Sequence, residues 1–417
     1  MTSSTAPRVR LQVPDRQQPV PTPSSFDALV PPEHPARILW TLLGTLDLSH
    51  FEDGITSLEG QAGRALLSPR MMLTLWLFAL TDGVSSARRI ALLTARDAAY
   101  RWIVADVHVS HDALSAFRRA HGDALDGLFT DVLATLLHKG LLSLALLGQD
   151  GTRTRAAATA PSFRTYGSLL ECRAQAALHL KAVRAAADEH SVAEQARRET
   201  MARDFQARVE AAITAVQALQ AERGPADAPA RASTTDAEAR VMKMGDGGFR
   251  PAFNVQYAVA GSAAGGPRAV VGVIVTNVGS DMGSLTPMID QIVRRTGQCP
   301  AVVLADCGHA KHEDIIAATQ RGATVLVPPS EQARPIAVLR EEGAPPEVIA
   351  WRERMETAEA TEQYRARASL CELNNAHQKT HQGIGQFLVR GLHKVTCVIL
   401  MGAIATNLMQ FASGLLA

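Results

Sequence analysis

Residues Leu141–Arg155, LLSLALLGQDGTRTR, place an acid directly after a run of apolar side chains. The run is short, rich in leucine and closed by Gly148, which is typical of a strand buried on both faces. Asp150 is therefore expected where this strand leaves the sheet. A carboxylate at that point is costly unless something pairs with it. A turn cap and a metal ion are both suitable partners, and Asp150 alone does not choose between them.

The chain before this strand is predicted to be helical. Met1–Ala36 is rich in Pro, Ser and Gln and is expected to be a disordered arm. Beyond it, apolar residues recur at i, i+3 and i+4, which predicts short helices. These helices are expected over Leu39–Phe51, Pro69–Leu80, Val84–Leu93, Ala95–Val104, Ser110–His121 and Asp123–His138.

After this strand, the pattern of apolar residues along the chain changes twice. Arg173–Glu222 is rich in Ala, Arg, Glu and Gln, which favours a helical hairpin, and a linker follows it. Strand and helix patterns then alternate, and a mostly helical stretch over Pro346–Ala376 follows them. The predicted strands are Ala252–Ala260, Ala269–Val278, Ala301–Ala305 and Thr324–Val327, and the helices between them are Ser280–Arg295 and Lys311–Gln320. Pro328–Pro346 is predicted to be a polar loop.

This element order predicts an α/β fold. Three strands followed by alternating helices and strands give a mixed sheet with flanking helices, which is the order of the ribonuclease H-like fold. An all-α N-terminal domain precedes the sheet, and a helical insertion follows its first strand. The expected domains are an arm over 1–36, a helical domain over 37–139 that binds DNA, and a catalytic domain over 140–417 with the insertion at about 165–240.

Three acids stand at the ends of elements that this fold brings together. Asp150 and Asp306 end strands that are parallel neighbours, and Glu372 lies on the helix after the last strand. Ligand sites in open α/β sheets form at this edge. Carboxylates are hard ligands suited to Mg²⁺ or Mn²⁺, and two such ions activate a nucleophile and stabilise the leaving oxygen of a phosphodiester. A helix cap is the favoured role for Asp281, and zinc at His309 and His312 is disfavoured because no matching cluster of ligands accompanies them.

Basic residues accompany the third acid. In one regular helix, Arg365 and Lys379 would lie within about 20° of the face of Glu372, whereas Arg367 would lie about 140° away. Arg365 and Lys379 are thus the candidates for holding a phosphate beside the metal ions. Beyond Glu372 the chain has no acid, and its cations include Arg390 and Lys394.

The helical N-terminal part carries four further arginines. They either contact DNA or solvate a helical bundle, and the sequence leaves both readings open. They are Arg88, Arg89, Arg118 and Arg119. The formal net charge of +1 hides the clustering of basic residues in the segment beyond Glu372.

The amino-acid composition indicates in which cellular compartment the protein is expected. Five scattered cysteines without a CxxC spacing argue against a disulfide framework or a zinc ribbon, and no apolar signal segment opens the chain. Val395–Ala417 carries no charge, but its Asn407 and Gln410 favour a buried core helix over a membrane span. The protein is expected in the cytoplasm.

The motifs around the acids resemble those of the DDE transposases of bacterial insertion sequences, in the group with a helical N-terminal domain of unknown function. QDGTRTRA around Asp150, LADCGHAKHEDI around Asp306 and YRARASLCELNNAHQK around Glu372 carry the resemblance. Tyr364, Arg367, Glu372 and Lys379 match the family's Tyr-Arg-Glu-Lys signature. FLVRGLHKV, GGFRPAFNVQYAV and TNVGSDMGSLTPMIDQI are also similar.

The resemblance implies a transposase that uses Mg²⁺ or Mn²⁺ on double-stranded DNA. It would cut and join DNA at the terminal inverted repeats of its element, with Asp150, Asp306 and Glu372 as metal ligands. A homodimer on DNA, associated with the bacterial nucleoid, is expected because two element ends must be held together. The alternatives are a catalytically silent DNA-binding protein or repressor derived from a transposase, and a ribonuclease H-like nuclease of another substrate.

Overall fold

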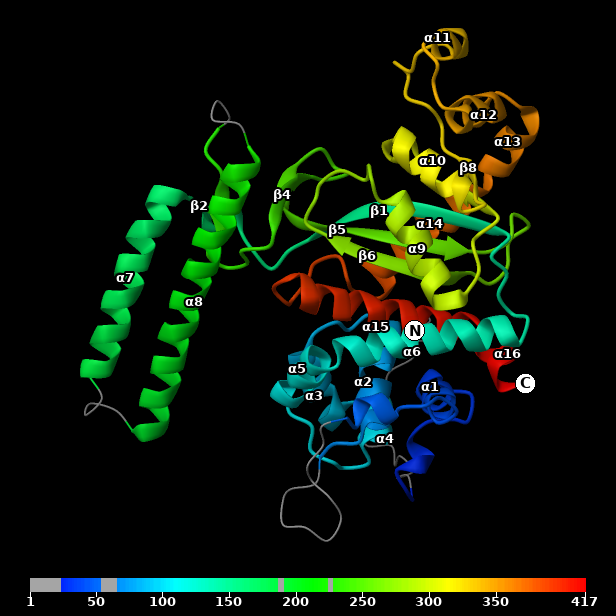
Figure 1. The fold of residues 1–417 in the computed structure, drawn as a ribbon. Coiled ribbons are helices and arrows are strands. Elements are labelled where there is room, and N and C mark those ends of the chain that lie inside the picture. Colours follow the sequence, from blue (N-terminus) through cyan, green and yellow to red (C-terminus); the bar gives the residue numbers. More distant parts are fainter. Residues whose placement is uncertain (1–23, 54–65, 187–190, 224–227) are drawn as a thin grey trace, which may run out of the picture.

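The computed structural model of this protein describes residues 24–53, 66–186, 191–223 and 228–417 (Figure 1). A bundle of helices, a mixed sheet with its covering helices, and a helical hairpin that projects to one side make up the molecule. Residues 1–23 of the predicted arm lie outside the described residues. The remainder of that arm folds into the short helix η1 (Asp27–Leu29) and enters α1 (Pro35–Leu43).

The N-terminal helices follow the predicted apolar periods. Pro35 and Pro69 stand at the first positions of their helices, where proline has no hydrogen bond to lose. Ser86, Asp97 and Ser110 each accept a backbone N–H and so cap the helix that follows. Besides α1 these elements are η2 (Ser49–Phe51), α2 (Pro69–Thr81), α3 (Ala87–Arg96), α4 (Ala98–Val104), α5 (His111–Ala120) and α6 (Gly122–His138).

The sheet has six strands in the order β4-β5-β1-β7-β8, with β6 also paired to β5. β1 runs antiparallel to β5 and parallel to β7, and β8 is parallel to β7. Antiparallel pairings join β1, β4, β5 and β6, and β7 and β8 then add in parallel to β1. This mixed sheet confirms the predicted α/β fold of the ribonuclease H-like type. The strands are β1 (Leu146–Arg155), β4 (Arg240–Lys243), β5 (Phe249–Ala260), β6 (Ala269–Thr276), β7 (Val302–Leu304) and β8 (Thr324–Leu326).

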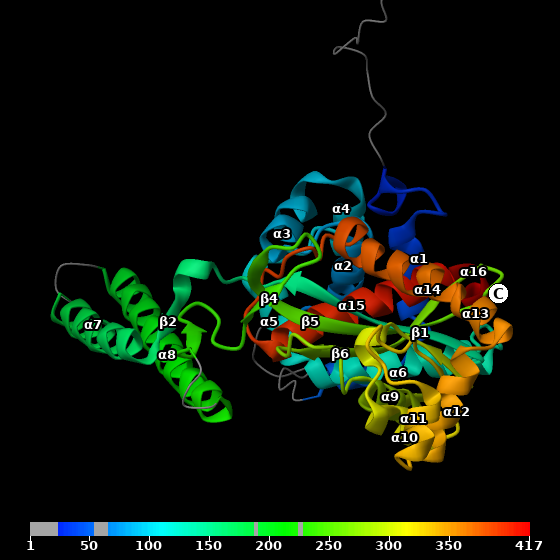
Figure 2. The same cartoon turned by 90° about the horizontal axis from the view of Figure 1, so that it is seen from above.

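Helices cover both faces of this sheet (Figure 2). α14 (Ala366–Ala376) packs on one face, where a Cβ added at Gly148 would lie 2.7 Å from Cys371 Sγ. α9 (Leu285–Thr296) lies on the other, where Gln149 donates to the Ser284 carbonyl just before it. Because side chains alternate along a strand, Asp150 faces α14 and Gly151 faces the opposite side.

The rest of the C-terminal half supports these layers. η5 (Cys307–His309) and α10 (His312–Gln320) join β7 to β8, and α11 (Ile336–Glu341), α12 (Pro346–Met355) and α13 (Ala358–Tyr364) lead into α14. The π-helix η6 (His377–His381) follows α14 without a break. α15 (Leu392–Gln410) and α16 (Ala412–Leu416) end the chain.

α15 lies at the centre of the molecule. It packs against β6 on one side and against α2 and α6 on the other, so one continuous hydrophobic core joins the helical bundle to the sheet. Asn407 within it is fully buried and bonds both the N–H and the carbonyl of Val270. The helix is long and apolar enough to cross a membrane, but 72% of its most apolar window is buried inside the protein.

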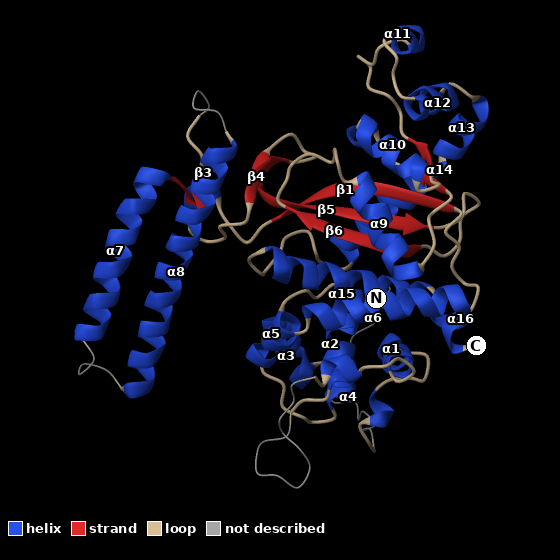
Figure 3. Cartoon of the chain, viewed as in Figure 1, coloured by secondary structure: helices blue, strands red, loops and turns tan. Residues whose placement is uncertain are grey.

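The insertion between β1 and β5 is a helical hairpin, α7 (Tyr166–Ala185) and α8 (Val192–Glu222). It has a small hydrophobic cluster of its own, which includes Leu169, Val209 and Val216. The short strands β2 (Phe163–Thr165) and β3 (Arg231–Ser233) pair at its base, close to the 3₁₀ turn η3 (Ala160–Ser162) (Figure 3).

Three sequence expectations differ from the structure. β1 begins at Leu146 and continues five residues past Asp150, because β5 pairs with it as far as Arg155. The helix predicted from Ser280 begins at Leu285, since the Asp281 side chain is buried in a polar network and caps nothing. The loop predicted over Pro328–Pro346 contains α11.

Candidate active site

Asp150 and Asp306 lie side by side on neighbouring strands. The parallel register pairs Gly148 with Leu304, so each aspartate stands two residues beyond a paired position. Asp150 is still within β1, but it is past the point where β1 leaves β7. The Asp306 side chain is 38% exposed and that of Asp150 is 16% exposed.

Helix α14 supplies the polar partners of these carboxylates. Arg367 Nη2 donates to Asp150 Oδ1 at 3.0 Å and lies 3.7 Å from Asp306 Oδ2. Asn375 Nδ2 donates to Asp150 Oδ2 at 2.8 Å, and the buried Asn375 Oδ1 has no hydrogen-bond partner. Arg367, Cys371 and Asn375 are spaced by four, so one stripe of the helix faces β1.

A network of buried polar side chains holds the Asp306 carboxylate in place. His309 is fully buried, and its Nδ1 lies 2.7 Å from Asp306 Oδ1 while its Nε2 lies 3.1 Å from Gln256 Oε1. Gln256 Nε2 donates to Asp281 Oδ1, so the carboxylate of Asp281 orients this amide. Both ring nitrogens of His309 therefore face oxygen atoms of neighbouring side chains.

The two aspartates have different electrostatic environments. Burial raises the pKa of Asp150, and the nearby Arg367 guanidinium only partly opposes this. The hydrogen bond from His309 lowers the pKa of Asp306. Asp306 is thus the better anion, and its Oδ2 keeps lone pairs free because its contact to Arg367 is too long for a hydrogen bond.

The third predicted acid does not join this pair. Glu372 is exposed, and no hydrogen bond or ion pair links it to any other described residue. It lies about 60° around the helix from Asn375. Across the described ranges, no group of three His, Cys, Asp or Glu side chains is arranged to hold a metal ion.

Tyr364 and Lys379 lie near the aspartates. The Tyr364 hydroxyl donates to the Ala305 carbonyl at 3.2 Å and so links the end of α13 to the residue before Asp306. Burial lowers the pKa of Lys379, and the charge of Asp150 opposes this shift. The charge of Asp150 therefore acts on Lys379, although no hydrogen bond or ion pair joins these two described side chains.

Helix arithmetic selected the wrong arginine. Arg365, predicted to lie beside the metal ions, is 72% exposed and pairs with Glu362. Arg367 reaches both aspartates instead. The arithmetic took the face of Glu372 as the face of the site. Glu372 and Arg367 both lie in α14, about 140° apart, and it is Arg367 that faces the aspartates.

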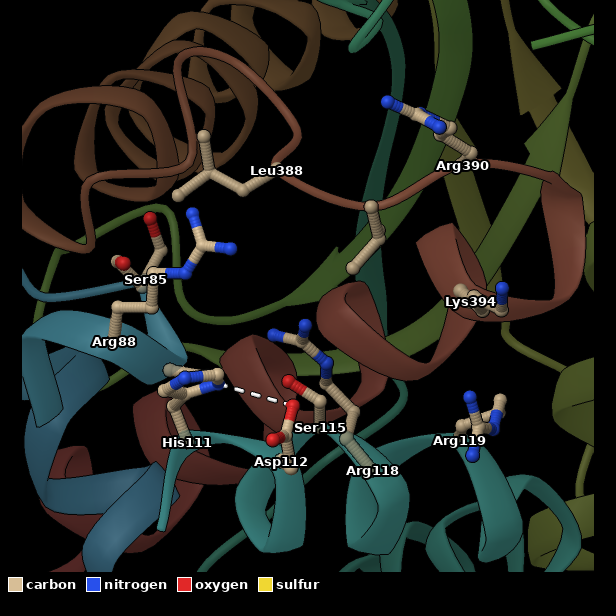
Figure 4. Close-up of a pocket in the computed structure, with 13 residues that line it drawn as sticks. Ser85, Arg88, His111, Asp112, Ser115, Arg118, Arg119, Leu388, Arg390 and Lys394 are labelled. Carbon is tan, nitrogen blue, oxygen red and sulfur yellow. Dashed lines mark ion pairs between the residues drawn. The ribbon is translucent and has the colours of Figure 1, made fainter. Parts of the chain in front are cut away.

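Most of the predicted DNA-contacting cations converge elsewhere, in one pocket (Figure 4). Its lining includes Arg88, Arg118, Arg119, Arg390 and Lys394, and we call it the basic pocket. Arg89, on the next position of α3, does not line it.

Several site residues were not found from the sequence. Asn375, Gln256 and Asp281 are common polar residues whose role depends on the register of strands and on the face of α14. His309 was considered only as a zinc ligand. Its spacing of three from Asp306 was the available signal, because a short turn after a strand returns the side chain to the strand end.

Comparison with known protein families gives two matches. A family model described as a transposase DDE domain matches residues 331–412, and one described as a transposase domain of unknown function matches residues 24–120. The first covers Glu372 and the whole of α14, and the second covers the N-terminal helices as far as α5. Searches of curated proteins and of solved structures find no match to this chain.

Proposed function

Because this chain belongs to the insertion-sequence DDE transposases, we propose that it cuts and joins DNA at the terminal inverted repeats of its element by two-metal-ion chemistry. The observation that carries the proposal is the pair Asp150 and Asp306, held side by side on parallel strands. They lie beneath α14, which is part of the segment that matches the transposase DDE domain.

The residues present fit a hard divalent cation such as Mg²⁺ or Mn²⁺. Asp306 Oδ2 has no hydrogen bond, and Asn375 Oδ1 is a buried amide oxygen without a partner close to Asp150. Oxygen atoms of both kinds are ligands of Mg²⁺. Asp150 and Asp306 would hold the ions, and Glu372 would complete the set from the exposed flank of α14. When bound, the ions would activate the attacking oxygen and stabilise the leaving oxygen.

The other residues of the site position these groups. His309 fixes one oxygen of Asp306, and the other has no hydrogen bond to the described residues. Arg367 offsets the repulsion between two neighbouring carboxylates, and Tyr364 holds α13 to the end of β7. Lys379 would contact a phosphate of the bound DNA. Two DNA ends must be joined in one reaction, so the active form would be a homodimer on double-stranded DNA at the nucleoid.

The test is excision of a mini-element in cells that express Asp150→Asn, Asp306→Asn or Glu372→Gln. We expect each to reduce excision by at least about 10³-fold, since loss of a metal ligand removes several kcal/mol of transition-state stabilisation. Asp131→Asn, an exposed aspartate on α6, is the matched control and should excise normally. Wild-type excision by Asp150→Asn or Asp306→Asn would refute the proposal.

The second candidate is a DNA-binding protein without the chemistry, derived from a transposase. The outward position of Glu372 and the contact of Arg367 with both aspartates favour it. Incubating the wild-type protein with Mn²⁺ and an oligonucleotide that carries an element end separates the two. A DNA shift without nicking would support the second candidate, and metal-dependent nicking would exclude it.

A further inference from the structure

The basic pocket lies between segments that are far apart in the sequence. It has a volume of about 580 Å³. The beginnings of α3 and α5 form one side, and Leu388–Arg390 with the start of α15 form the other (Figure 4). Neither aspartate of the active site lines it. Each of the two segments that match transposase families supplies part of its wall.

The charge of this pocket is strongly one-sided. Five cations line it, and none of them forms an ion pair with a carboxylate in the described part of the chain. They are Arg88, Arg118, Arg119, Arg390 and Lys394. The one acid in the lining, Asp112, lies 3.1 Å from His111 of the same lining. Arginines elsewhere, such as Arg153 and Arg295, are paired with aspartates.

Arg118 is the least expected member of this set. The residue is only 6% exposed, and its guanidinium carbon lies 4.2 Å from the centre of the Trp76 ring. The Trp76 indole donates to the Leu114 carbonyl, which fixes the ring. The guanidinium has no hydrogen-bond acceptor among the described residues and points into the pocket in Figure 4. Burial lowers the pKa of Arg118 to about 10.

A buried cation without a counter-ion is costly, and an anion in the pocket would remove that cost. Two helix ends add to the positive potential, since α3 and α5 both begin at the pocket after the capping residues Ser86 and Ser110. The guanidinium group of arginine presents a planar fork of hydrogen-bond donors, and this fork matches the oxygen atoms of a phosphate.

We propose that the basic pocket binds a phosphodiester of the DNA backbone, with Arg118 as its buried anchor. The proposal rests on the proposed function in that the ligand is the transposase's own DNA. It adds a second DNA contact, which lies outside the active site. The residues of this contact come from the N-terminal helices and from the segment after α14. A strand held there would be gripped without regard to its sequence, because phosphates carry no sequence information.

The test measures the affinity of the full-length protein for a fluorescent random-sequence DNA duplex over a range of salt concentrations. Each phosphate contact contributes about 0.9 to the slope of log affinity against log salt. Arg88→Ala and Arg390→Ala should each lower that slope by about 1. Arg96→Ala is the matched control, because it removes an exposed arginine from the same helix outside the pocket, and it should leave the slope unchanged.

Arg118 is tested by a substitution that keeps its charge. Arg118→Lys loses the planar fork but not the cation, and we expect weaker binding with thermal stability close to that of the wild type. Arg118→Met should raise the melting temperature in the absence of DNA, since it removes an unpaired buried charge, and should weaken binding further. A fall in melting temperature for Arg118→Met would contradict the inference that Arg118 is a buried charge without a counter-ion.

The remaining outcomes are also decisive. Salt slopes equal to that of the wild type in Arg88→Ala and Arg390→Ala would overturn the proposal, while metal-dependent nicking by the same variants would leave the proposed function intact. If inorganic phosphate raises the melting temperature of the wild type and DNA binding does not depend on the pocket, the site takes a free anion and the DNA assignment is wrong.

Discussion

Asp150 is a residue of the site whose charge depends on its surroundings. It accepts from Arg367 and Asn375, yet burial outweighs these partners and raises its pKa. The folded protein therefore binds this proton more tightly than the unfolded chain does. The pKa of Asp150 is near 3.8 in the unfolded chain and higher in the folded protein. As the pH rises through this interval, the free energy of unfolding falls, because the folded protein loses its tightly bound proton.

Asp150→Asn should consequently raise the free energy of unfolding at neutral pH, because the amide keeps the shape and carries no charge. The gain should disappear below the unfolded pKa, where the wild-type carboxyl is neutral in both states. Chemical denaturation at several pH values measures it. Asp131→Asn, an exposed substitution, should stay within about 0.5 kcal/mol of the wild type at each pH. A destabilised Asp150→Asn at neutral pH would show that the pair with Arg367 outweighs burial.

The sequence located residues of this site only where the local geometry was regular. Asp150 and Asp306 could be placed together because a short strand ending in an acid has few interpretations, and in the structure β1 and β7, which lead to them, pair in parallel. The partner arginine could not be identified by helix arithmetic, because the arithmetic was centred on Glu372, and Glu372 lies about 140° around α14 from Arg367, which faces the aspartates. The resemblance to a family signature selected Arg367 where that arithmetic failed.

At the scale of elements, the distance between α14 and β1 depends on one glycine. A Cβ at Gly148 would lie 2.7 Å from Cys371 Sγ and 2.9 Å from Leu370 Cβ. Glycine here lets the helix approach the strand closely enough for Arg367 and Asn375 to reach Asp150. The contact is one of close packing, since Leu370 is fully buried.

Gly148→Ala should lower the free energy of unfolding by about 1–3 kcal/mol, which is the usual cost of overpacking a core. Urea denaturation measures it. Adding Cys371→Ala should restore part of the loss, because it removes the closer of the two clashing atoms. Gly167→Ala on α7, where an added Cβ meets nothing within 4 Å, should instead stabilise by about 0.5–1 kcal/mol. Equal effects of the two glycine substitutions would show that α14 does not depend on close packing.

The elements themselves were predicted with uneven success, for physical reasons. β5 and β6 alternate or are β-branched and were found near their true bounds. The start of α9 was misplaced because Ser280 and Asp281 are good capping residues in sequence. In the structure Asp281 accepts from Asn254, Gln256 and Arg153, and these partners come from strands that are distant in the chain.

At the scale of the whole molecule, a buried ionic contact ties the helical bundle to the sheet layer. Arg295 of α9 donates to the Asp126 carboxylate and carbonyl and to Thr130 of α6. The Arg295 side chain is 2% exposed, whereas that of Asp126 is 46% exposed. Removing the aspartate would leave a nearly buried guanidinium without its carboxylate.

Asp126→Ala should reduce the free energy of unfolding by about 2 kcal/mol, below the 3–5 kcal/mol of a fully buried pair because solvent screens Asp126. Calorimetry should still show one transition for the bundle and the sheet, since they share a core. Asp131→Ala, on the same helix and exposed, should change little. Two separate transitions would mean that bundle and sheet are independent folding units.

This shared core is the property that the sequence did not reveal. A boundary at residues 139/140 was expected because the helical pattern ends there and the strand pattern begins. The boundary ignores α15, which is far away in the chain yet packs on α2 and α6 as well as on β6. An apolar helix such as α15 indicates that it is buried, but its composition does not indicate which partners bury it.

The central position of α15 has a consequence for biosynthesis. A ribosome makes α2 and α6 several hundred codons before it makes α15, so the first helices must wait with their apolar faces uncovered. The nascent chain therefore cannot complete its core until translation has passed residue 410. A polypeptide truncated before α15 would leave the apolar faces of α2 and α6 without the helix that covers them.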